Sequence, residues 1–571
     1  MTLPDPNSKP ERADSNWRKW ISKWLPNRPS GLVSSSDAAA DEADVAMLML
    51  MPESQNSTPN PASDQPQGAR SGRKLALLLM AGAIFSKALG FVREISMAHV
   101  FGASMVADGF RAAVTGTFLP LALLQNESVP TILIPMYREW QNQGNAPKQF
   151  AALTVALSLV GIAIMSLVIG FGALFVRLMV GGFAAEAQQI TLDFLRVMAL
   201  GMPASVLLNV LASGEIALGR PRLTSLRASL LNISVIVGLL ILVLTEWRGA
   251  LAWAVAFAFN ALGVWGLLTL IWDGSLDFKG LKIADVGHQL HQFWLRLRPL
   301  LAVPVSDQAN VWFERILASR LAVGAVASLD YARTITDSAV LFVSQPLGLA
   351  LLSSAPTTDY NSRMQSIARP LLAIAIPASV CLGMFAPDLA RLVFSRGAFN
   401  EAAVQLTGQA MRGIAVGLWA TTLGWILLRM LNSLGRNKTA GLILVMAYLS
   451  NLATNLLFST VPALREFGPF LLGFSEAIRG FVLLFATALA MRCTLTLLHL
   501  LILAAIPATI MAVSGFAILE IFSGSLQRLG AAGVACLFSC LIGGAVLAPR
   551  VTSAFFRKSL KFLNRFTGGA L

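Results

Sequence analysis

The sequence predicts an all-α integral membrane protein with about 14 transmembrane helices in two lobes around a central cavity, preceded by a disordered N-terminal tail. Composition gives the first reason, since 55% of the 571 residues are hydrophobic and only 13% are charged. The mean hydropathy of +0.66 gives the second. The third is that fourteen apolar stretches fill nearly everything after residue 72. Because the hydrocarbon offers backbone groups no water, such stretches must be helices of about 20 residues.

The first 72 residues differ in composition from the rest of the chain. They are rich in Pro, Ser, Asn, Asp and Gln and contain no long apolar run, which predicts a disordered cytoplasmic tail. Within this tail, Trp17, Trp20 and Trp24 recur at helical spacing among cations. That pattern fits either a short helix lying on the membrane surface or a disordered segment that adheres to it.

The fourteen predicted spans share an apolar run and flanking polar residues. They cover residues 75–98, 106–126, 150–176, 192–215, 224–246, 249–272, 297–320, 330–353, 369–394, 405–430, 438–460, 467–491, 495–519 and 528–548. The longest polar interruption separates six spans from eight, as in a transporter built from two related bundles. We therefore divide the chain into a tail (1–72), an N-lobe of spans one to six (73–272), a cytoplasmic linker (273–296), a C-lobe of spans seven to twelve (297–491), two additional spans (492–550) and a basic cytoplasmic tail (551–571).

Basic residues between the spans predict the orientation. They gather in alternate loops, which favours both termini in the cytoplasm of a bacterial inner-membrane protein. Examples from the loops assigned to the cytoplasm are Lys148, Arg222, Lys282, Arg436 and Arg492, whereas the other loops hold fewer, such as Arg248 and Arg465, with Arg396 as an exception. The net charge of +14 follows from this bias and from contact with anionic headgroups, so we expect no nucleic-acid partner.

Charged residues inside the predicted spans are the candidates for function, because intramembrane charge is costly. They cluster in the first two spans of each lobe. The cations are Lys87, Arg93, Arg111, Arg315 and Arg333, and the acids are Glu94, Asp108, Glu127, Asp307 and Glu314. Cations facing a cavity bind a phosphate or pyrophosphate through charge-assisted hydrogen bonds. We expect the acids to be gating residues or counter-charges that pair with these cations when the site is empty.

Two further expectations concern span two. Asp108 and Arg111 stand three residues apart, a spacing at which they can neutralise each other on a helix. After Glu127, Pro130 and Pro135 are expected to break the helix and free backbone groups to line a cavity.

Other chemistries find less support. The sequence has no phosphate-binding loop of the G-x-x-x-x-G-K-[ST] type, and its four histidines lack metal-binding spacing. We therefore expect a transporter without a cofactor, driven by the membrane potential or an ion gradient. A cation or drug exporter and a membrane-embedded glycosyl- or phosphotransferase remain alternatives, although no loop after residue 72 is long enough for a catalytic domain.

Several motifs resemble a known family. SKALGFVREISMAHVFGASMVADGF (Ser86–Phe110) is similar to the N-terminal signature of the MurJ/MviN proteins. SLLNIS (Ser229–Ser234), LAWAV (Leu251–Val255), ILASRLAVGAVASLDYA (Ile316–Ala332) and LVFSRGAFN (Leu392–Asn400) follow in the family's order. The resemblance covers about residues 73–550 and implies a member of the multidrug/oligosaccharidyl-lipid/polysaccharide exporter superfamily.

The resemblance implies a flippase that moves an undecaprenyl-pyrophosphate-linked saccharide to the outer leaflet by alternating access, functional as a monomer among membrane lipids. The cargo it implies is the peptidoglycan precursor lipid II. By position, Arg93 matches an arginine of the family's signature, and Lys87 and Glu94 replace an arginine and an aspartate. Asp108 and Glu127 match family acids.

Two departures from the family pattern matter for the cargo. Residues 119–123 read Leu-Pro-Leu-Ala-Leu where the family has paired arginines, and Arg333 comes one place early. A flippase for an exopolysaccharide or O-antigen repeat unit is therefore the alternative.

Overall fold

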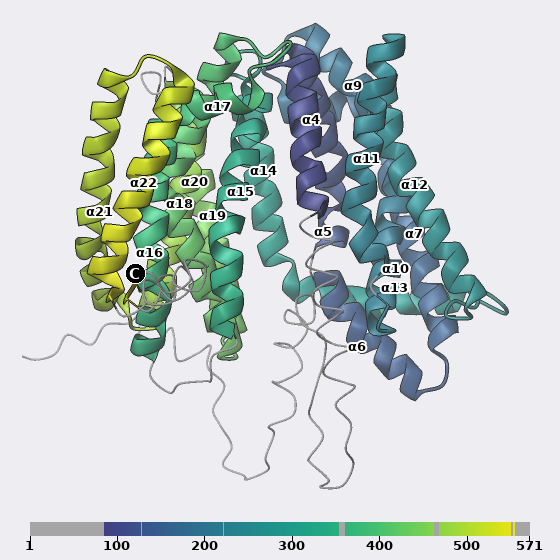
Figure 1. Ribbon diagram of the computed structural model, residues 1–571. Helices are drawn as coiled ribbons and strands as arrows, with labels where there is room; N and C mark the ends of the chain where they lie inside the picture. Colours follow the sequence, from purple (N-terminus) through teal and green to yellow (C-terminus); the bar gives the residue numbers. More distant parts are fainter. Residues whose placement is uncertain are drawn as a thin grey trace, which may run out of the picture.

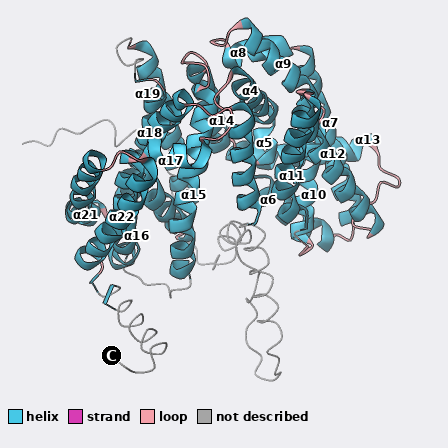
Figure 2. Cartoon of the chain, turned by 45° about the horizontal axis from the view of Figure 1, so that its top comes forward, coloured by secondary structure: helices cyan, strands magenta, loops and turns pink. Residues whose placement is uncertain are grey.

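The computed structural model describes residues 85–126, 128–220, 222–352, 360–461, 467–549 and 552–553, with the side chains of 339–352 and 360 excepted. Within these ranges the protein is built of helices joined by short loops, without a strand (Figure 2). The predicted tail 1–72, the candidate Glu127 and all but two residues of the C-terminal tail lie outside the described residues.

The chain forms two groups of helices that stand side by side (Figure 1). We call residues 85–297 the N-half. It contains the helical residues 85–101, α4 (Met105–Phe118), the 3₁₀ turn η1 (Leu119–Leu121), α5 (Ala122–Gln125), α6 (Ser128–Asn142), α7 (Ala146–Gly170), α8 (Gly172–Val180), α9 (Ala185–Ala199), α10 (Met202–Ala217), α11 (Arg222–Thr245), α12 (Gly249–Trp272) and α13 (Ile283–Leu297).

We call residues 302–549 the C-half, which follows the 3₁₀ turn η2 (Arg298–Leu300). It contains α14 (Ala302–Ala318), α15 (Ala325–Leu352), α16 (Tyr360–Met384), α17 (Ala386–Phe394), α18 (Glu401–Ser433), α19 (Asn437–Thr460), α20 (Pro469–Ala490), α21 (Thr494–Ile521) and α22 (Ser525–Leu547).

The helices match the predicted membrane spans. In the described part of the chain, nine helices are long and apolar enough to cross a membrane, and α9 with α10 forms a tenth, bent by 47°. The nine are α7, α11, α12, α16, α18, α19, α20, α21 and α22. The other four predicted spans correspond to the helical residues 85–101, to α4 with η1 and α5, to α14 and to α15. These four segments carry the charged clusters. The prediction of an all-helical membrane protein is confirmed.

Several spans are interrupted where the sequence predicted one helix. Span four bends at Gly201, two residues before Pro203, which has no N–H to continue the ladder of hydrogen bonds. Span two loosens into η1 at Pro120 and ends at Gln125. The expectation that Pro130 and Pro135 break the helix was wrong, because both lie inside α6. Pro130 lies in its first turn, where a backbone N–H has no helical partner, and Pro135 is a tolerated interior proline.

The linker also holds more structure than the sequence predicted. α13 is an amphipathic helix that packs against α6 and α7. Arg296 donates two hydrogen bonds to Glu139, of 3.0 and 2.8 Å, and Gln289 donates to Gln149 at 2.6 Å. These bonds attach the linker to the N-half.

Packing within the C-half brings two backbones into contact. Gly413 and Gly417 of α18 face α20 so closely that a Cβ atom on either would overlap backbone atoms of α20. The small residues Gly473 and Ala477 of α20 complete the contact. Glycines four residues apart commonly permit such approach in membranes, where association depends on van der Waals packing. α18 and α20 therefore form a rigid pair at the centre of the C-half.

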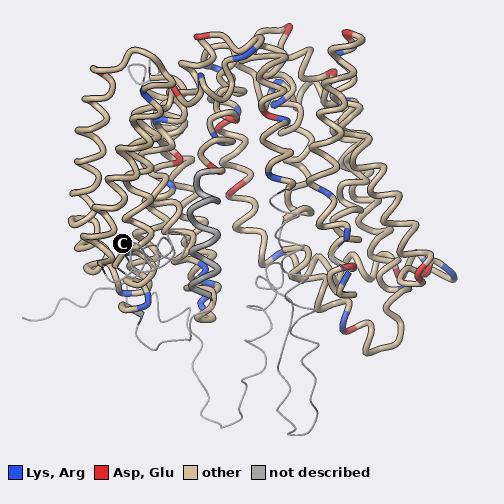
Figure 3. The backbone as a smooth tube through the Cα atoms, in the orientation of Figure 1, with Lys and Arg blue, Asp and Glu red and all other residues tan. Residues whose placement is uncertain are grey.

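The two halves touch mainly at one end. We call the end that bears α13 and the loops 433–436 and 491–493 the linker face, and the end with loops 102–104, 181–184, 319–324 and 395–400 the opposite face. On the opposite face Ala398 N–H donates to His99 O at 2.9 Å, and Gly182 N–H donates to Ser319 Oγ at 3.2 Å. Among described residues, the hydrogen bonds that cross between the halves belong to these loops and to the adjoining helix ends. Charged residues gather on the facing helices and at the loop ends (Figure 3).

A glycine substitution tests the closure of the opposite face. Gly324 has a φ of +88° and lies against the backbone of Ala103, so a Cβ there meets both strain and overlap. Gly274, with a φ of +74°, has open space around it. Both Gly→Ala variants incur the left-handed penalty of about 1 kcal/mol. We expect Gly324→Ala to lower the melting temperature in detergent well beyond Gly274→Ala. Equal melting temperatures would contradict the contact.

Candidate functional site

The polar site begins on the helical residues 85–101, where Arg93 and Glu94 stand side by side. Glu94 is buried, with 3% of its surface exposed. It accepts a hydrogen bond from Arg93 Nε at 3.2 Å and pairs with Arg111 of α4. Arg93 Nη1 also donates to Asn232 Oδ1 of α11 at 3.0 Å. The motif around Arg93 thus places one carboxylate between two arginines and fixes it against α11.

Asp108 has a different role from the one expected. Its two carboxylate oxygens accept the backbone N–H groups of Gly324, at 2.6 Å, and Ala327, at 2.8 Å. Since α15 begins at Ala325, these are unpaired N–H groups of a helix N-terminus, and a carboxylate suits them in hydrogen bonding and in dipole. Asp108 therefore caps a helix of the other half. It does not pair with Arg111, as the three-residue spacing had suggested, because Arg111 binds Glu94.

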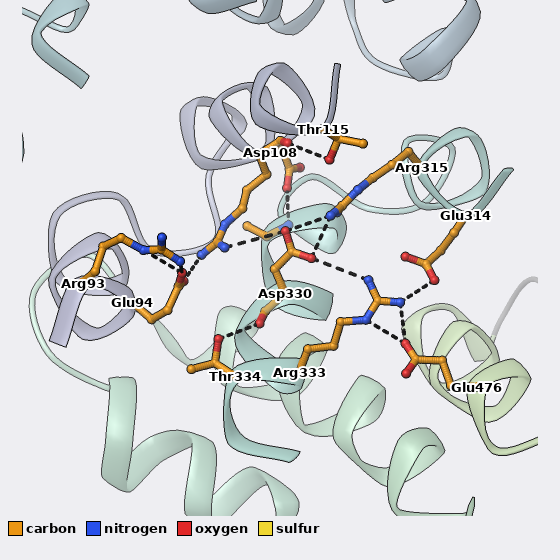
Figure 4. A network of polar contacts seen from close by, with 12 residues as sticks. Arg93, Glu94, Asp108, Thr115, Glu314, Arg315, Asp330, Arg333, Thr334 and Glu476 are labelled. Carbon is orange, nitrogen blue, oxygen red and sulfur yellow. Dashed lines mark hydrogen bonds and ion pairs between the residues drawn. The ribbon is translucent and has the colours of Figure 1, made fainter. Parts of the chain in front are cut away.

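Asp330 of α15 is the centre of the network (Figure 4). Arg315 Nη2 donates to both of its oxygens, at 2.9 and 3.0 Å. Arg111 Nη1 and Arg333 Nη1 each lie 3.7 Å from one of them. The Arg111 guanidinium also lies 4.8 Å from the ring centre of Tyr331. Because Arg111 belongs to α4, Asp330 joins the N-half to the C-half.

The network continues into the C-half through Arg333. Its Nε donates to Glu476 Oε1 of α20 at 2.8 Å, and its Nη2 donates to Glu314 Oε2 of α14 at 2.5 Å. Arg479 Nη2 lies 3.7 Å from the second oxygen of Glu476. Arg333 therefore ties three helices together, and Glu314, 1% exposed, is compensated by it.

The remaining candidates lie around this network. Lys87 is exposed and forms no ion pair with any residue in the described ranges. Arg315 is buried at 6% exposure, and Asp330 is its acceptor. Asp307 accepts hydrogen bonds from Gln308, at 3.0 Å, and from Tyr448.

The network contains one more cation than carboxylates. Its arginines are Arg93, Arg111, Arg315, Arg333 and Arg479, and its acids are Glu94, Asp330, Glu314 and Glu476. Each of these arginines lies within ion-pair distance of at least one carboxylate.

Three members of the network escaped sequence analysis: Asp330, Glu476 and Arg479. Asp330 and Arg333, like Glu476 and Arg479, are three residues apart, a spacing that puts opposite charges on one helix face. The rule that intramembrane charge marks function applied to both pairs. That signal was present in the sequence.

Outside this network, the described residues form other ion pairs, such as those of Arg391 with Asp388 and Glu401. They contain no group of His, Cys, Asp and Glu that could hold a metal ion. A cavity of about 370 Å³ between η1, α7 and α8 is lined by apolar side chains such as Pro120, Val168 and Phe175. Its lining carries no charge for an anion.

Comparison with known proteins identifies the family. The family model described as lipid II flippase MurJ matches residues 97–557, which is most of the chain. The chain belongs to the MurJ family. The probable lipid II flippase MurJ of Thermotoga maritima is 23% identical over 375 residues, which are 65% of this chain and 76% of that protein. The lipid II flippase MurJ of Burkholderia cenocepacia is 27% identical over 386 residues, covering 62% and 72% of the two chains.

A solved structure of lipid II flippase MurJ, in an inward closed conformation, has the same fold. Its TM-score is 0.71 at 18% identity, and the similarity covers 83% of this chain and 99% of that one. The resemblance seen in the sequence motifs is therefore confirmed. MurJ proteins are flippases, so the chain is a multi-pass membrane transporter that acts on a lipid-linked saccharide and not a transferase.

Two alanine substitutions test the helix cap formed by Asp108. Replacing a capping side chain by alanine costs about 0.5–2 kcal/mol. We expect Asp108→Ala to loosen the contact between the halves, measured as faster labelling of cysteines introduced on the opposite face. Ser104→Ala is the matched control, because Ser104 caps α4 within its own half through Ala107 N–H at 3.4 Å. Equal labelling of the two variants would mean that Asp108 does not hold the halves together.

Proposed function

We propose that this protein flips lipid II from the inner to the outer leaflet of the bacterial inner membrane by alternating access. The observation that carries the proposal is the set of arginines from both halves that meets at Asp330 and Glu94. Arginine suits phosphate oxygens because its planar group donates two parallel hydrogen bonds. The family membership supplies the cargo, and the polyprenyl tail stays in the lipid.

Exchange of partners at these arginines provides the coupling. Glu94, Asp330, Glu314 and Glu476 form ion pairs with these cations. A pyrophosphate that binds the same arginines releases the carboxylates and changes which contacts join the halves. A ligand shifts a conformational equilibrium only through such differential contacts.

The closure at the opposite face supports loading from the inner leaflet. With both termini in the cytoplasm, as the basic loops predict, the opposite face points outward. The closing contacts of Asp108, Gly102 and Gly324 then lie on the outer side. Membrane potential or an ion gradient is the proposed energy source, since one charge crossing 100 mV corresponds to about 2.3 kcal/mol.

One observation favours a second cargo. At Leu119–Leu121, where the resemblance implies paired arginines, the chain has a 3₁₀ turn whose Leu121 is fully buried. Arg111 stands near the other end of span two, bound to Glu94 and Asp330. A repeat unit of an exopolysaccharide or O-antigen keeps the pyrophosphate and differs in its sugars. It is therefore the second candidate.

Complementation separates the two cargos. We expect the gene to restore growth of a strain depleted of its only lipid II flippase, at ordinary expression. The matched measurement is surface polysaccharide in a deletion of the gene in its own host. Failure to restore growth, together with loss of surface polysaccharide, would replace lipid II by the second candidate.

A substitution at Arg93 tests the phosphate role within the same assay. Arg93→Ala should abolish complementation at normal expression, because it removes one cation of the proposed anion site. Arg93→Lys should retain part of the activity, since the charge remains but the two-pronged geometry does not. Arg177→Ala, at an exposed site on α8, is the control and should complement fully. Full complementation by Arg93→Ala would exclude Arg93 from the site.

A further inference from the structure

Three arginines from three helices converge on the carboxylate of Asp330 (Figure 4). Arg315 of α14 binds it in a two-oxygen contact at 2.9 and 3.0 Å. Arg111 of α4 and Arg333 of α15 lie at 3.7 Å, within ion-pair range but beyond a hydrogen bond. One carboxylate thus faces three guanidinium groups and forms hydrogen bonds with only one of them.

The same arginines have donors left over. Nε and Nη1 of Arg315, and Nε of Arg111, are buried without a hydrogen-bond partner. The side chains of Arg315 and Arg111 are only 8% and 11% exposed, so bulk water does not serve these atoms. Buried guanidinium N–H groups are costly when unpaired. The cluster therefore offers more donors than Asp330 can accept.

A pyrophosphate matches this surplus better than a carboxylate does. It carries its oxygens on two phosphorus atoms and so reaches donors that lie too far apart for one carboxyl group. Arginine recognises such groups by pairs of hydrogen bonds. The three arginines come from both halves, which is where a ligand must bind if it is to influence how the halves meet.

We propose that the Asp330 carboxylate occupies the position where the ligand's pyrophosphate binds. It competes with the pyrophosphate for Arg111, Arg315 and Arg333. That the ligand carries a pyrophosphate rests on the proposed function, whereas the location of the anion-binding position rests on the geometry. Asp330 acts through the arginines and is a positioning residue that keeps affinity for the anion low. Removing its charge should therefore strengthen anion binding, whereas loss of any of the arginines should weaken it.

The test is a titration of the full-length protein in nanodiscs with inorganic pyrophosphate. Asp330→Asn keeps the shape and removes the competing charge. We expect its Kd to fall about tenfold relative to wild type, because charges a few ångströms apart interact strongly in a partly buried site. A parallel titration with orthophosphate distinguishes a site that prefers pyrophosphate from a site that binds any phosphate.

Asp337→Asn is the matched control. It makes the same chemical change on the same helix, at an exposed residue that forms no ion pair in the described part of the chain. Asp337 still interacts electrostatically with Arg333, Lys87 and Arg479, so it reports the effect of net charge alone. We expect a smaller change than for Asp330→Asn, because Asp337 forms no ion pair with Arg111, Arg315 or Arg333.

Arg111→Gln separates competition from a loosened contact between the halves. Both Arg111→Gln and Asp330→Asn break the ion pair between α4 and α15. If loosening alone raised affinity, Arg111→Gln would also bind pyrophosphate more tightly. The proposal requires weaker binding. Tighter binding by both variants overturns it.

An unchanged or higher Kd for a folded Asp330→Asn protein also overturns the proposal. If that variant does not fold, Asp330→Ser removes the same charge and takes its place under the same criteria. Failure of the cargo assignment is separate, because it appears as absent complementation while Asp330→Asn still binds pyrophosphate more tightly. If the gene complements but Asp330→Asn does not bind pyrophosphate more tightly, the proposal about Asp330 is rejected and the proposed flippase function stands.

Discussion

A guanidinium group in the interior of a membrane protein requires an acceptor, and this requirement organises the interface of the two halves. An arginine keeps its charge under all physiological conditions, so burial cannot be relieved by deprotonation. Arg333 meets the requirement with Glu314, Glu476 and Asp330, from three different helices. Arg111 meets it with Glu94 and Asp330, from both halves. The position of each buried arginine thus depends on the acids around it, and the position of each acid depends on its arginines.

Apolar packing occurs both within the halves and between them, and the interface adds polar contacts. Within the halves, apolar side chains and glycines pack, as between α18 and α20. Between the halves, the ion pair of Arg111 with Asp330, the Asp108 cap and a few backbone contacts accompany an apolar cluster that includes residues of both halves. Packed apolar surfaces rearrange with difficulty, whereas a charged group can change partners without opening a void. The polar contacts between the halves suit a transporter whose halves change how they meet.

The sequence predicted the helical class, the spans and the charged positions, because apolar length and intramembrane charge are local properties. It did not predict pairing, because pairing depends on which helices meet. Asp108 and Arg111 share a helix but bind different partners, and Asp108 reaches a helix start more than 200 positions away. Span two is interrupted at Pro120 and not at Pro130 or Pro135, because the effect of a proline depends on where it stands in the helix. Asp330, at the start of span eight, and Glu476, in span twelve, carry the same signal of intramembrane charge, so their place in the site was predictable.

The glycine contact between α18 and α20 has a consequence for how the protein is made. The two helices are separated in the chain by α19, so α18 leaves the ribosome before its partner exists. Its stripe of Gly413 and Gly417 offers no side chain to shield the backbone from lipid. Only when α20 has been synthesised and inserted does that stripe find its complement. Biogenesis of the C-half therefore includes an interval, set by the translation of α19 and α20. During this interval α18 lies in the membrane without its packing partner.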